Sequence, residues 1–434
     1  MQNQGIRDAR SLGTPKLLVL GLQHMFAMFG ATVLVPALTG LSVSATLLFA
    51  GLGTLFFHFL TKGKVPAFLG SSFAYLAGYA AIAPNGEAAL LPYACVGVAA
   101  SGLLYLILSA LVRGFPPVVT GPIIICIGMT LANSAINNCT GSWDIALVAI
   151  LTVVIFNIWG KGMLRIIPIL LGVLVSYVYA AVTGRVDFSG VASAAWIGLP
   201  VKMENTVFSL IGNCDANLLV TAIIAIMPIA FATMIEHIGD ICAISSTVGA
   251  NFIADPGLHR TLLGDGLATS IASLFGAPAN TTYGENTGVL ALTRVYDPLV
   301  IRLAAVYAII ASFCPKFAAL VSAMPTGTIG GVSLILYGMI SAIGVRNLVE
   351  NRVDLAKSRN VIVVSLIISL ALGITFSAAG AITFHVGEFT LNFSGLAVAA
   401  IVGIVVNAIL PGKDYNFQND YEYGKTTEDH GQML

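Results

Sequence analysis

A glycine followed by a carboxylate and an amide, Gly284-Glu285-Asn286, stands between two apolar stretches of this chain. The residues before it, Thr281 to Tyr283, favour an extended segment, and the apolar residues after it favour a helix. A helix that begins at Gly284 offers free N–H donors and a partial positive charge. Glu285 adds a carboxylate, which accepts hydrogen bonds. Together these groups can bind a flat molecule that carries both N–H and C=O groups.

The composition indicates that this break lies within a membrane. Of the 434 residues, 57% are hydrophobic and only 9% are charged, and the mean hydropathy is +0.92. In soluble domains about a quarter of the residues are charged. The sequence therefore predicts an all-α polytopic membrane protein, in which broken backbone must be packed in protein or line a cavity. Acidic and basic residues balance at 20 each, so the charge does not indicate a nucleic-acid partner.

No motif predicts an enzyme or a resident cofactor. The six cysteines lack paired spacing and are expected to be small packing residues. We find no His, Cys and Asp spacing that is typical of a metal site. There is also no nucleophile–base pair and no phosphate-binding loop of the kind that an enzyme or an ATP-driven pump needs.

Fourteen segments are apolar enough to be spans, which need about 20 residues, or fewer where the helix is broken. Seven precede a polar loop at 184–217 and seven follow it. The expected spans are 17–37, 44–61, 73–84, 90–112, 116–136, 144–160, 165–183, 218–240, 259–276, 285–296, 298–314, 322–343, 359–377 and 394–411.

The basic residues between these spans favour one orientation. With the N-terminus inside, the outer loops hold only Arg185, Lys202 and Lys316, and the inner loops hold the larger share. The positive-inside rule therefore predicts that both termini, 1–16 and 412–434, are cytoplasmic tails.

The two halves of the chain resemble one another at a separation of 210 residues. Gly121 matches Gly331, and Ser71-Ser72-Phe73 matches Thr281-Thr282-Tyr283. Because each half has seven spans, the second half would enter the membrane from the opposite side. Inverted repeats with broken helices at matching positions are typical of transporters with a site at the midplane. The two Ser/Thr-rich segments predict short antiparallel strands in the third and tenth spans.

Few ionisable residues fall within the expected spans. A charge at the bilayer centre is unfavourable by about 3 kcal/mol, so each is a candidate functional residue. Glu236 and Asp240 share one face of the eighth span, where burial and like charge would let one of them carry a proton. The alternative for Asp240 is a solvated place at the end of its helix. The alternative for Asp265 is a structural hydrogen bond to the loop or to the eighth span. His24 and His237 are expected to be buried hydrogen-bonding residues.

Three aromatic residues could enclose a planar heterocycle. Phe73 and Tyr283 occupy matching positions of the repeat, and Tyr337 lies in the twelfth span. For any one of them taken alone, an ordinary place in the core is the favoured alternative.

The stretch Glu285-Asn286-Thr287-Gly288, followed after four residues by Thr293-Arg294, resembles the signature of the nucleobase–ascorbate transporter family, also called the nucleobase:cation symporter-2 class. That signature is Gln/Glu/Pro-Asn-x-Gly-x4-Thr-Arg/Lys/Gly. Residues 66–73, 255–260 and 330–334 are also similar to the bacterial uracil permeases of this family. The resemblance extends from about Leu17 to about Leu410.

The resemblance implies a core domain, a gate domain and an elevator-type movement of the core. The core would comprise 17–112 and 218–314, and the gate 113–183 and 315–411. It further implies a homodimer formed through the gate domain, in the lipid of a bacterial plasma (inner) membrane.

The resemblance also implies roles for single residues. Carboxylates at Glu236 and Glu285 would hold the N–H and C=O edge of uracil, and the backbone amides of Phe73 and Gly284 would meet its carbonyl oxygens. The ring of Tyr283 would lie against the substrate, and Tyr337 would close the gate side. Supporting residues would be Gln23, His24 and Asn286.

Two departures leave alternatives open. Asp240 stands where a uracil permease of this family has a proton-coupling His, and Asp240 and Asp265 are more similar to the xanthine and urate branch. Glu285, in contrast, is typical of uracil transporters, since purine transporters usually have Gln there. We therefore expect uracil import by proton symport, with Glu236, Asp240 and Asp265 as candidate proton carriers. The alternatives are a proton-coupled xanthine or purine permease and, in another class, an anion exchanger or channel, which the two site carboxylates disfavour.

Overall fold

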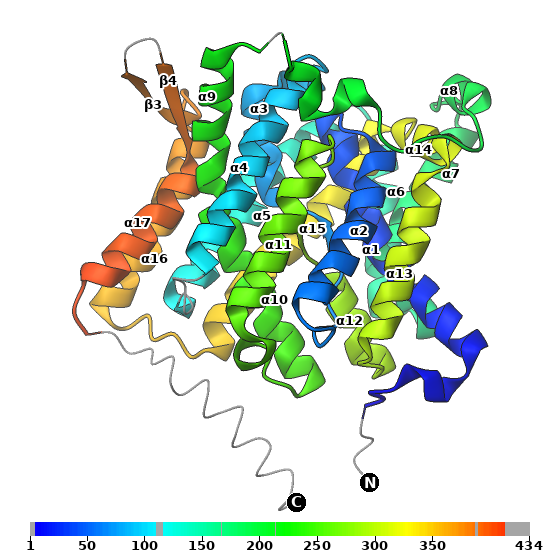
Figure 1. Ribbon diagram of the computed structural model, residues 1–434, viewed down its shortest axis with the longest axis horizontal. Helices are drawn as coiled ribbons and strands as arrows, with labels where there is room; N and C mark the ends of the chain where they lie inside the picture. The colour runs from blue at the N-terminus through cyan, green and yellow to red at the C-terminus, as the bar shows by residue number, and fades with distance from the viewer. Residues whose placement is uncertain (1–4, 110–115, 166, 213, 387–388, 413–434) are drawn as a thin grey trace, which may run out of the picture.

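The computed structural model describes residues 5–109, 116–165, 167–212, 214–386 and 389–412. Helices make up most of it, and short strands interrupt them (Figure 1). The strands are β1 (Leu69–Ser71), β2 (Asn280–Thr282), β3 (Ala381–Val386) and β4 (Phe389–Ser394). The α-helices are α1 (Thr14–Thr39), α2 (Val43–Leu60), α3 (Leu76–Ile82), α4 (Leu91–Ser109), α5 (Pro117–Cys139), α6 (Trp143–Ile158), α7 (Pro168–Val182), α8 (Ser189–Ser193), α9 (Ala216–Ile226), α10 (Ala230–Val248), α11 (Leu258–Leu274), α12 (Gly284–Thr293), α13 (Pro298–Ser312), α14 (Pro315–Ser322), α15 (Thr326–Glu350), α16 (Ser358–Thr375) and α17 (Gly395–Ile409).

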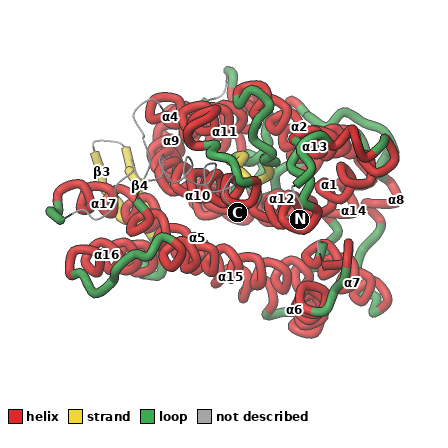
Figure 2. Tube along the Cα trace, turned by 90° about the horizontal axis from the view of Figure 1, so that it is seen from below, coloured by secondary structure: helices red, strands yellow, loops and turns green. Residues whose placement is uncertain are grey.

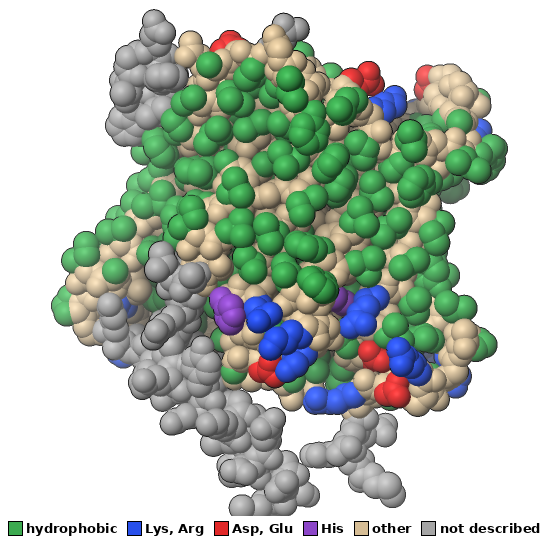
Figure 3. Space-filling model, in the orientation of Figure 1, with side chains coloured by type: hydrophobic (Ala, Val, Ile, Leu, Met, Phe, Trp, Pro, Cys, Tyr) green, Lys and Arg blue, Asp and Glu red, His purple; other side chains and the backbone are tan. Residues whose placement is uncertain are grey.

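Many of these helices can cross a membrane. Seven helical segments of the described chain are long and apolar enough, or eight if α13 and α14, which meet at 88°, form one bent span. Shorter apolar helices add to them, namely Phe73–Ile82, α6, α7 and α17. Hydrophobic side chains cover the middle of the visible face, and Lys and Arg side chains gather near its lower end (Figure 3). The expectation of a helical, multi-pass membrane protein is confirmed.

Each of the fourteen expected segments overlaps a described helix, with ends that differ by several residues. The last residues of the expected span 90–112 lie outside the described residues, as do 1–4 of the N-terminal tail and 413–434 of the C-terminal tail. The eighth segment, expected at 218–240, differs in shape. A 3₁₀ turn at Met227–Ile229 separates α9 from α10, and α10 then continues to Val248. Pro228 explains the break, because proline cannot donate the backbone hydrogen bond that a continuous helix needs.

The strands β1 and β2 pair antiparallel, which confirms the expected pairing. In their register Leu69 lies opposite Thr282 and Ser71 lies opposite Asn280. The pair extends by the Ser72 N–H, which donates to the Ala279 carbonyl at 2.8 Å. Every residue of both strands is buried. The ladder thus satisfies backbone groups that could not be left unpaired at membrane depth.

The hairpin of β3 and β4 was not expected within the segment 315–411. Its strands pair antiparallel from Ala381–Ser394 to Val386–Phe389, between α16 and α17. The signal was present in the sequence, since apolar and polar residues alternate through 389–393. The surrounding apolar spans obscured it.

The helices form two groups in projection. In Figure 2, α16, α5, α15 and α6 form a row, and the helices from α1 to α4 and α9 to α13 gather around the β1–β2 pair. Within the row, α5 and α15 approach closely through glycines. A Cβ atom at Gly128 would meet the Tyr337 carbonyl, and one at Gly344 would lie 2.6 Å from the Ile125 nitrogen. Small residues allow such close backbone contact in membrane proteins.

Candidate functional site

Two helix N-termini lie next to the strand pair. A 3₁₀ turn, η2 (Phe73–Tyr75), follows β1 and leads into α3, and α12 begins at Gly284 directly after Tyr283. The Tyr283 N–H donates a hydrogen bond to the Phe68 carbonyl at 3.1 Å. The next amide, that of Gly284, is the first of its helix and has no intrahelical acceptor, and the same holds for Phe73. The expected pair of N–H donors is therefore present at the ends of two opposed strands.

The three candidate aromatic residues have different surroundings. The Phe73 and Tyr337 rings meet edge to face, with centroids 5.7 Å apart, and both side chains are buried. This contact joins η2 to α15. Tyr283 instead packs against β1, where its hydroxyl donates to the Ser71 carbonyl at 2.9 Å. A Cβ atom on Gly70 would collide with the Tyr283 ring, so glycine is needed at that position.

The two carboxylates of α10 lie beside these elements. Glu236 and Asp240 are both half-buried, one helical turn apart. The Asp240 carboxylate accepts a hydrogen bond from the Thr282 hydroxyl at 2.8 Å. Because α10 continues to Val248, Asp240 lies well inside the helix, which argues against the alternative of a solvated helix end. Thr282 was not among the predicted site residues.

Asp265 of α11 has a buried partner on α10. The Asp265 Oδ2 and His237 Nδ1 atoms are 3.1 Å apart, and both side chains are fully buried. One turn before His237, the Thr233 hydroxyl accepts from the Tyr105 hydroxyl at 2.6 Å. The Tyr75 hydroxyl lies 3.3 Å from the same Thr233 oxygen. Two separate buried polar contacts thus join α10 to its neighbours: Thr233 meets Tyr105 of α4 and Tyr75 of η2, and His237 meets Asp265 of α11. The tyrosines and Thr233 were missed, because a hydroxyl in an apolar helix gives no distinctive sequence signal.

The predicted supporting residues join α1 to α12. The Asn286 Nδ2 atom lies 3.2 Å from the His24 Nδ1 atom and donates to the His24 carbonyl at 3.1 Å. His24 and Asn286 are both buried, as is Gln23. Glu285 is the second residue of α12, and its side chain is outside the part that the structure describes.

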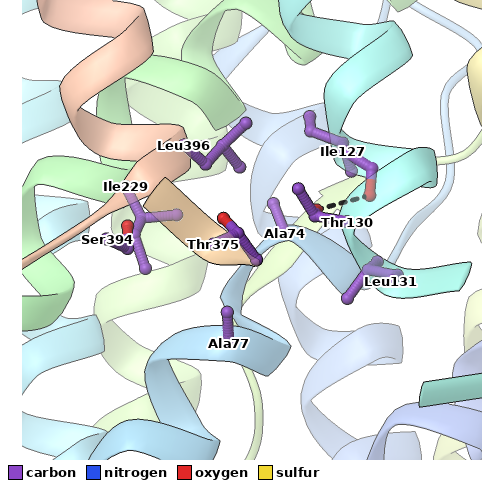
Figure 4. A pocket seen from close by; sticks show the side chains of 9 residues that line it. All are labelled: Ala74, Ala77, Ile127, Thr130, Leu131, Ile229, Thr375, Ser394 and Leu396. Carbon is purple, nitrogen blue, oxygen red and sulfur yellow. Dashed lines mark hydrogen bonds between the residues drawn. The ribbon is translucent and has the colours of Figure 1, made fainter. Parts of the chain in front are cut away.

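A small cavity is lined in part by Ala74, the residue that follows Phe73. Its volume is about 40 Å³, and it can hold water. Ile127, Thr130 and Leu131 of α5 line one side, and Ile229, Ser394 and Leu396 lie across from them (Figure 4). Ala74, Ala77 and Thr375 complete the lining. The Thr130 hydroxyl donates to the Ile127 carbonyl of its own helix at 3.1 Å, which leaves the lining mainly apolar.

Among the described residues, no group of three or more His, Cys, Asp or Glu side chains is placed to hold a metal ion. Of the predicted residues, Phe73, Gly284 and Tyr283 come together through the strand pair. Asp240 is joined to this group by Thr282, and Tyr337 is joined to it by Phe73. Asp265 is instead paired with His237 of α10.

Broken helices that meet at a strand pair inside a helical bundle define a membrane transporter fold. Two solved structures share it, with TM-scores above 0.5. They are the transmembrane domain of the cyanobacterial bicarbonate transporter BicA (TM-score 0.58, 15% identity, 80% of this chain and 97% of that one) and murine Slc26a9, an anion transporter in the inward-facing state (TM-score 0.61, 11% identity, 91% and 67%). At these identities the likeness shows the fold alone.

The sequence is also similar to named relatives. The profile of the permease family Xan_ur_permease matches residues 15–380. The uracil permease of Bacillus caldolyticus is 41% identical, over 96% of each chain. The uracil permease of Bacillus subtilis is 39% identical, over 99% of this chain and 98% of that one. That of Escherichia coli K12 is 38% identical, over 90% of each.

The chain belongs to this permease family, the nucleobase:cation symporter-2 class. The resemblance that the signature indicated is confirmed. Since the family and these relatives are permeases, the chain is a transporter and not an enzyme.

Proposed function

We propose that this protein imports uracil together with a proton. The observation that carries the proposal is the meeting of two helix N-termini, at Phe73 and Gly284, with the carboxylates of α10. Uracil carries N–H donors and C=O acceptors on one flat ring, so it needs acceptors and donors in this arrangement. The names of the relatives support uracil as the cargo.

In the proposed binding mode, Glu236 and Glu285 accept the ring N–H groups. The amides of Phe73 and Gly284 donate to the carbonyl oxygens. A hydrogen bond to a charged group contributes about 1.5–3 kcal/mol, and a donor left unpaired in a buried site is costly. Tyr337 would cover the site from α15, where its contact with Phe73 already closes the space between them.

Proton coupling is assigned to the carboxylates of the core. Glu236 is the first candidate, because one side chain would then bind both the substrate and the proton. Asp240 is the second, since its bond with Thr282 joins it to the strand that precedes Gly284. Asp265 is the third, through its contact with His237.

The proposed architecture has fourteen spans in two inverted repeats, both termini in the cytoplasm and a place in the bacterial inner membrane. The opposed half-helices after β1 and β2 support the inversion. The two helix groups of Figure 2 support a core and a gate that move relative to each other as an elevator. A homodimer formed through the gate, in contact with membrane lipid, completes the proposal.

A proton-coupled xanthine or purine permease is the second candidate. Asp240 in place of His favours it, whereas Glu285 in place of Gln favours uracil. A glutamate offers only acceptors, and a glutamine offers both a donor and an acceptor. The relatives named above favour uracil.

The deciding experiment is uptake of radiolabelled uracil into proteoliposomes with an imposed inward proton gradient. We expect uptake that a protonophore abolishes and that excess unlabelled xanthine leaves unchanged. Uptake blocked by xanthine would favour the purine alternative. Uptake that persists with the protonophore present would contradict proton symport.

A further inference from the structure

The N-terminal segment Gly5–Leu12 is bound to the far end of α12. The Ile6 N–H donates to the Arg294 carbonyl at 2.8 Å, and the Tyr296 N–H donates to the Ile6 carbonyl at 2.8 Å. These two bonds form a parallel bridge between Ile6 and Val295, immediately after α12 ends. Segments almost 290 residues apart in sequence are therefore paired through their backbones.

Asp297 extends this attachment. One of its carboxylate oxygens accepts from the Ala9 N–H at 2.8 Å. The other accepts from the Leu299 N–H at 2.9 Å and caps the start of α13. Ala9 is fully buried, and the Arg7 guanidinium donates to the Val248 carbonyl at the end of α10. These contacts anchor the segment, although its polar side chains at Arg7, Asp8, Arg10 and Ser11 are exposed.

The half-helix α12 is consequently held at both ends. At its first residue, Gly284, it continues from β2, which pairs with β1. At its last turn, Arg294 adopts a left-handed conformation, with φ 54°, and the chain passes directly into the bridge with Ile6. Ten helical residues span about 15 Å, and a helix of that length moves as a rigid rod. A displacement at the Arg294 end is therefore transmitted to the amide of Gly284.

We propose that residues 5–12 are a positioning element for the substrate-binding half-helix. The segment sets where α12 lies along its own axis and thereby fixes the Gly284 amide relative to β1. The inference rests on the proposed function only for the identity of the ligand. A purely structural role would lower thermal stability and leave the affinity of the folded protein unchanged.

The substitution Asp297→Asn tests the positioning role, because it replaces one of the two carboxylate oxygens by an NH₂ group. The amide oxygen of Asn can still cap α13, because Asn and Asp are equally good N-cap residues. The side-chain NH₂ group cannot accept the Ala9 N–H, so that bond is lost. Asp8→Asn is the matched control. Among the described residues, the Asp8 side chain accepts from the backbone amide of Arg10 through one oxygen, which the amide oxygen of Asn can replace.

Uracil binding to the purified full chain is measured by isothermal calorimetry, beside the melting temperature. We expect the Kd of Asp297→Asn to rise at least about threefold, which is the size of effect that the loss of one hydrogen bond produces. The Kd of Asp8→Asn should match that of the wild type. A chain that starts at Gly13 after its initiator Met should show a larger loss. Unchanged Kd values in both Asp297→Asn and the truncated chain would overturn the proposal.

Hydrogen exchange of the peptide 284–293 separates this inference from the proposed function. It needs no ligand, so it stays informative if the wild type fails to bind uracil. We expect faster exchange in Asp297→Asn than in Asp8→Asn or the wild type. Equal exchange in all three proteins would show that the segment does not hold α12, whatever the substrate is.

Discussion

Glu236 and Asp240 occupy one face of α10, and we expect them to have different roles. Asp240 is held by the Thr282 hydroxyl at 2.8 Å. This bond connects it to the strand β2 and so to the start of α12. Glu236 lies one turn nearer the break at Pro228 and is half-buried in the same face. At the residue scale, we therefore expect substitutions to separate substrate binding from proton coupling.

Glu285→Gln should weaken uracil binding by about 10- to 100-fold. A ring N–H would lose a charged acceptor, which contributes about 1.5–3 kcal/mol. Binding to the purified variant is measured by calorimetry. Glu204→Gln is the control, because Glu204 is exposed in the loop before α9. This variant should bind uracil as tightly as the wild type does. Wild-type affinity in Glu285→Gln would remove this residue from the site.

Asp240→Asn should leave uracil binding and exchange largely intact and stop accumulation against a gradient. The amide oxygen of Asn can still accept from Thr282, so the local structure is kept, but the side chain can no longer take up a proton. Counterflow of labelled uracil and gradient-driven uptake are compared in the same vesicles. Normal accumulation by the variant would assign the proton to another group, with Glu236 as the first candidate.

At the scale of elements, the contact of Phe73 with Tyr337 lies between η2 and α15 and closes one side of the site. The cavity beside it has walls from both helix groups, with Ala77 on α3 and Thr130 on α5. If the groups separate during transport, this cavity must widen. We expect it to become part of the access path to the site.

A cysteine at Ala74, a buried residue of the cavity lining, should therefore react with a membrane-impermeant thiol reagent faster during transport than at rest. The reagent is applied from outside, with the exposed Cys214 and Cys242 and the partly exposed Cys314 replaced by serine. Ser193→Cys is the control, since residue 193 is exposed on α8 and should react equally in both conditions. An Ala74→Cys side chain that stays unreactive throughout transport would place the access path elsewhere.

At the scale of the whole molecule, local patterns in the sequence predicted most helices and the β1–β2 pair. Hydropathy predicts the apolar helices, and the Ser/Thr-rich segments with a glycine break predict the strands. A bond from Asp265 to the eighth span was one of the alternatives, but its partner His237 and the contact of Asp240 with Thr282 could not be predicted. Each depends on how separate helices pack, and no periodicity within one segment records that. The attachment of Ile6 to Val295 was hidden for the same reason.

The movement of the core against the gate can be tested with one disulfide. A Cβ atom at Gly30 on α1 would lie 3.6 Å from the Ile169 Cβ atom on α7, a separation that suits a disulfide. In a chain without its native cysteines, oxidation of Gly30→Cys/Ile169→Cys should abolish uracil uptake, and reduction should restore it. Uracil binding should persist, because the disulfide joins residues that are not part of the proposed binding site.

The matched control joins two helices of the proposed gate. Gly172→Cys/Val153→Cys connects α7 with α6, where a Cβ atom at Gly172 would contact the Val153 side chain. Since both helices would move together, this bond should leave uptake unchanged. If uptake continued after complete oxidation of the Gly30–Ile169 pair, α1 and α7 would belong to one rigid body. The proposed division into core and gate would then be wrong, while the binding site around β1 and β2 would stand.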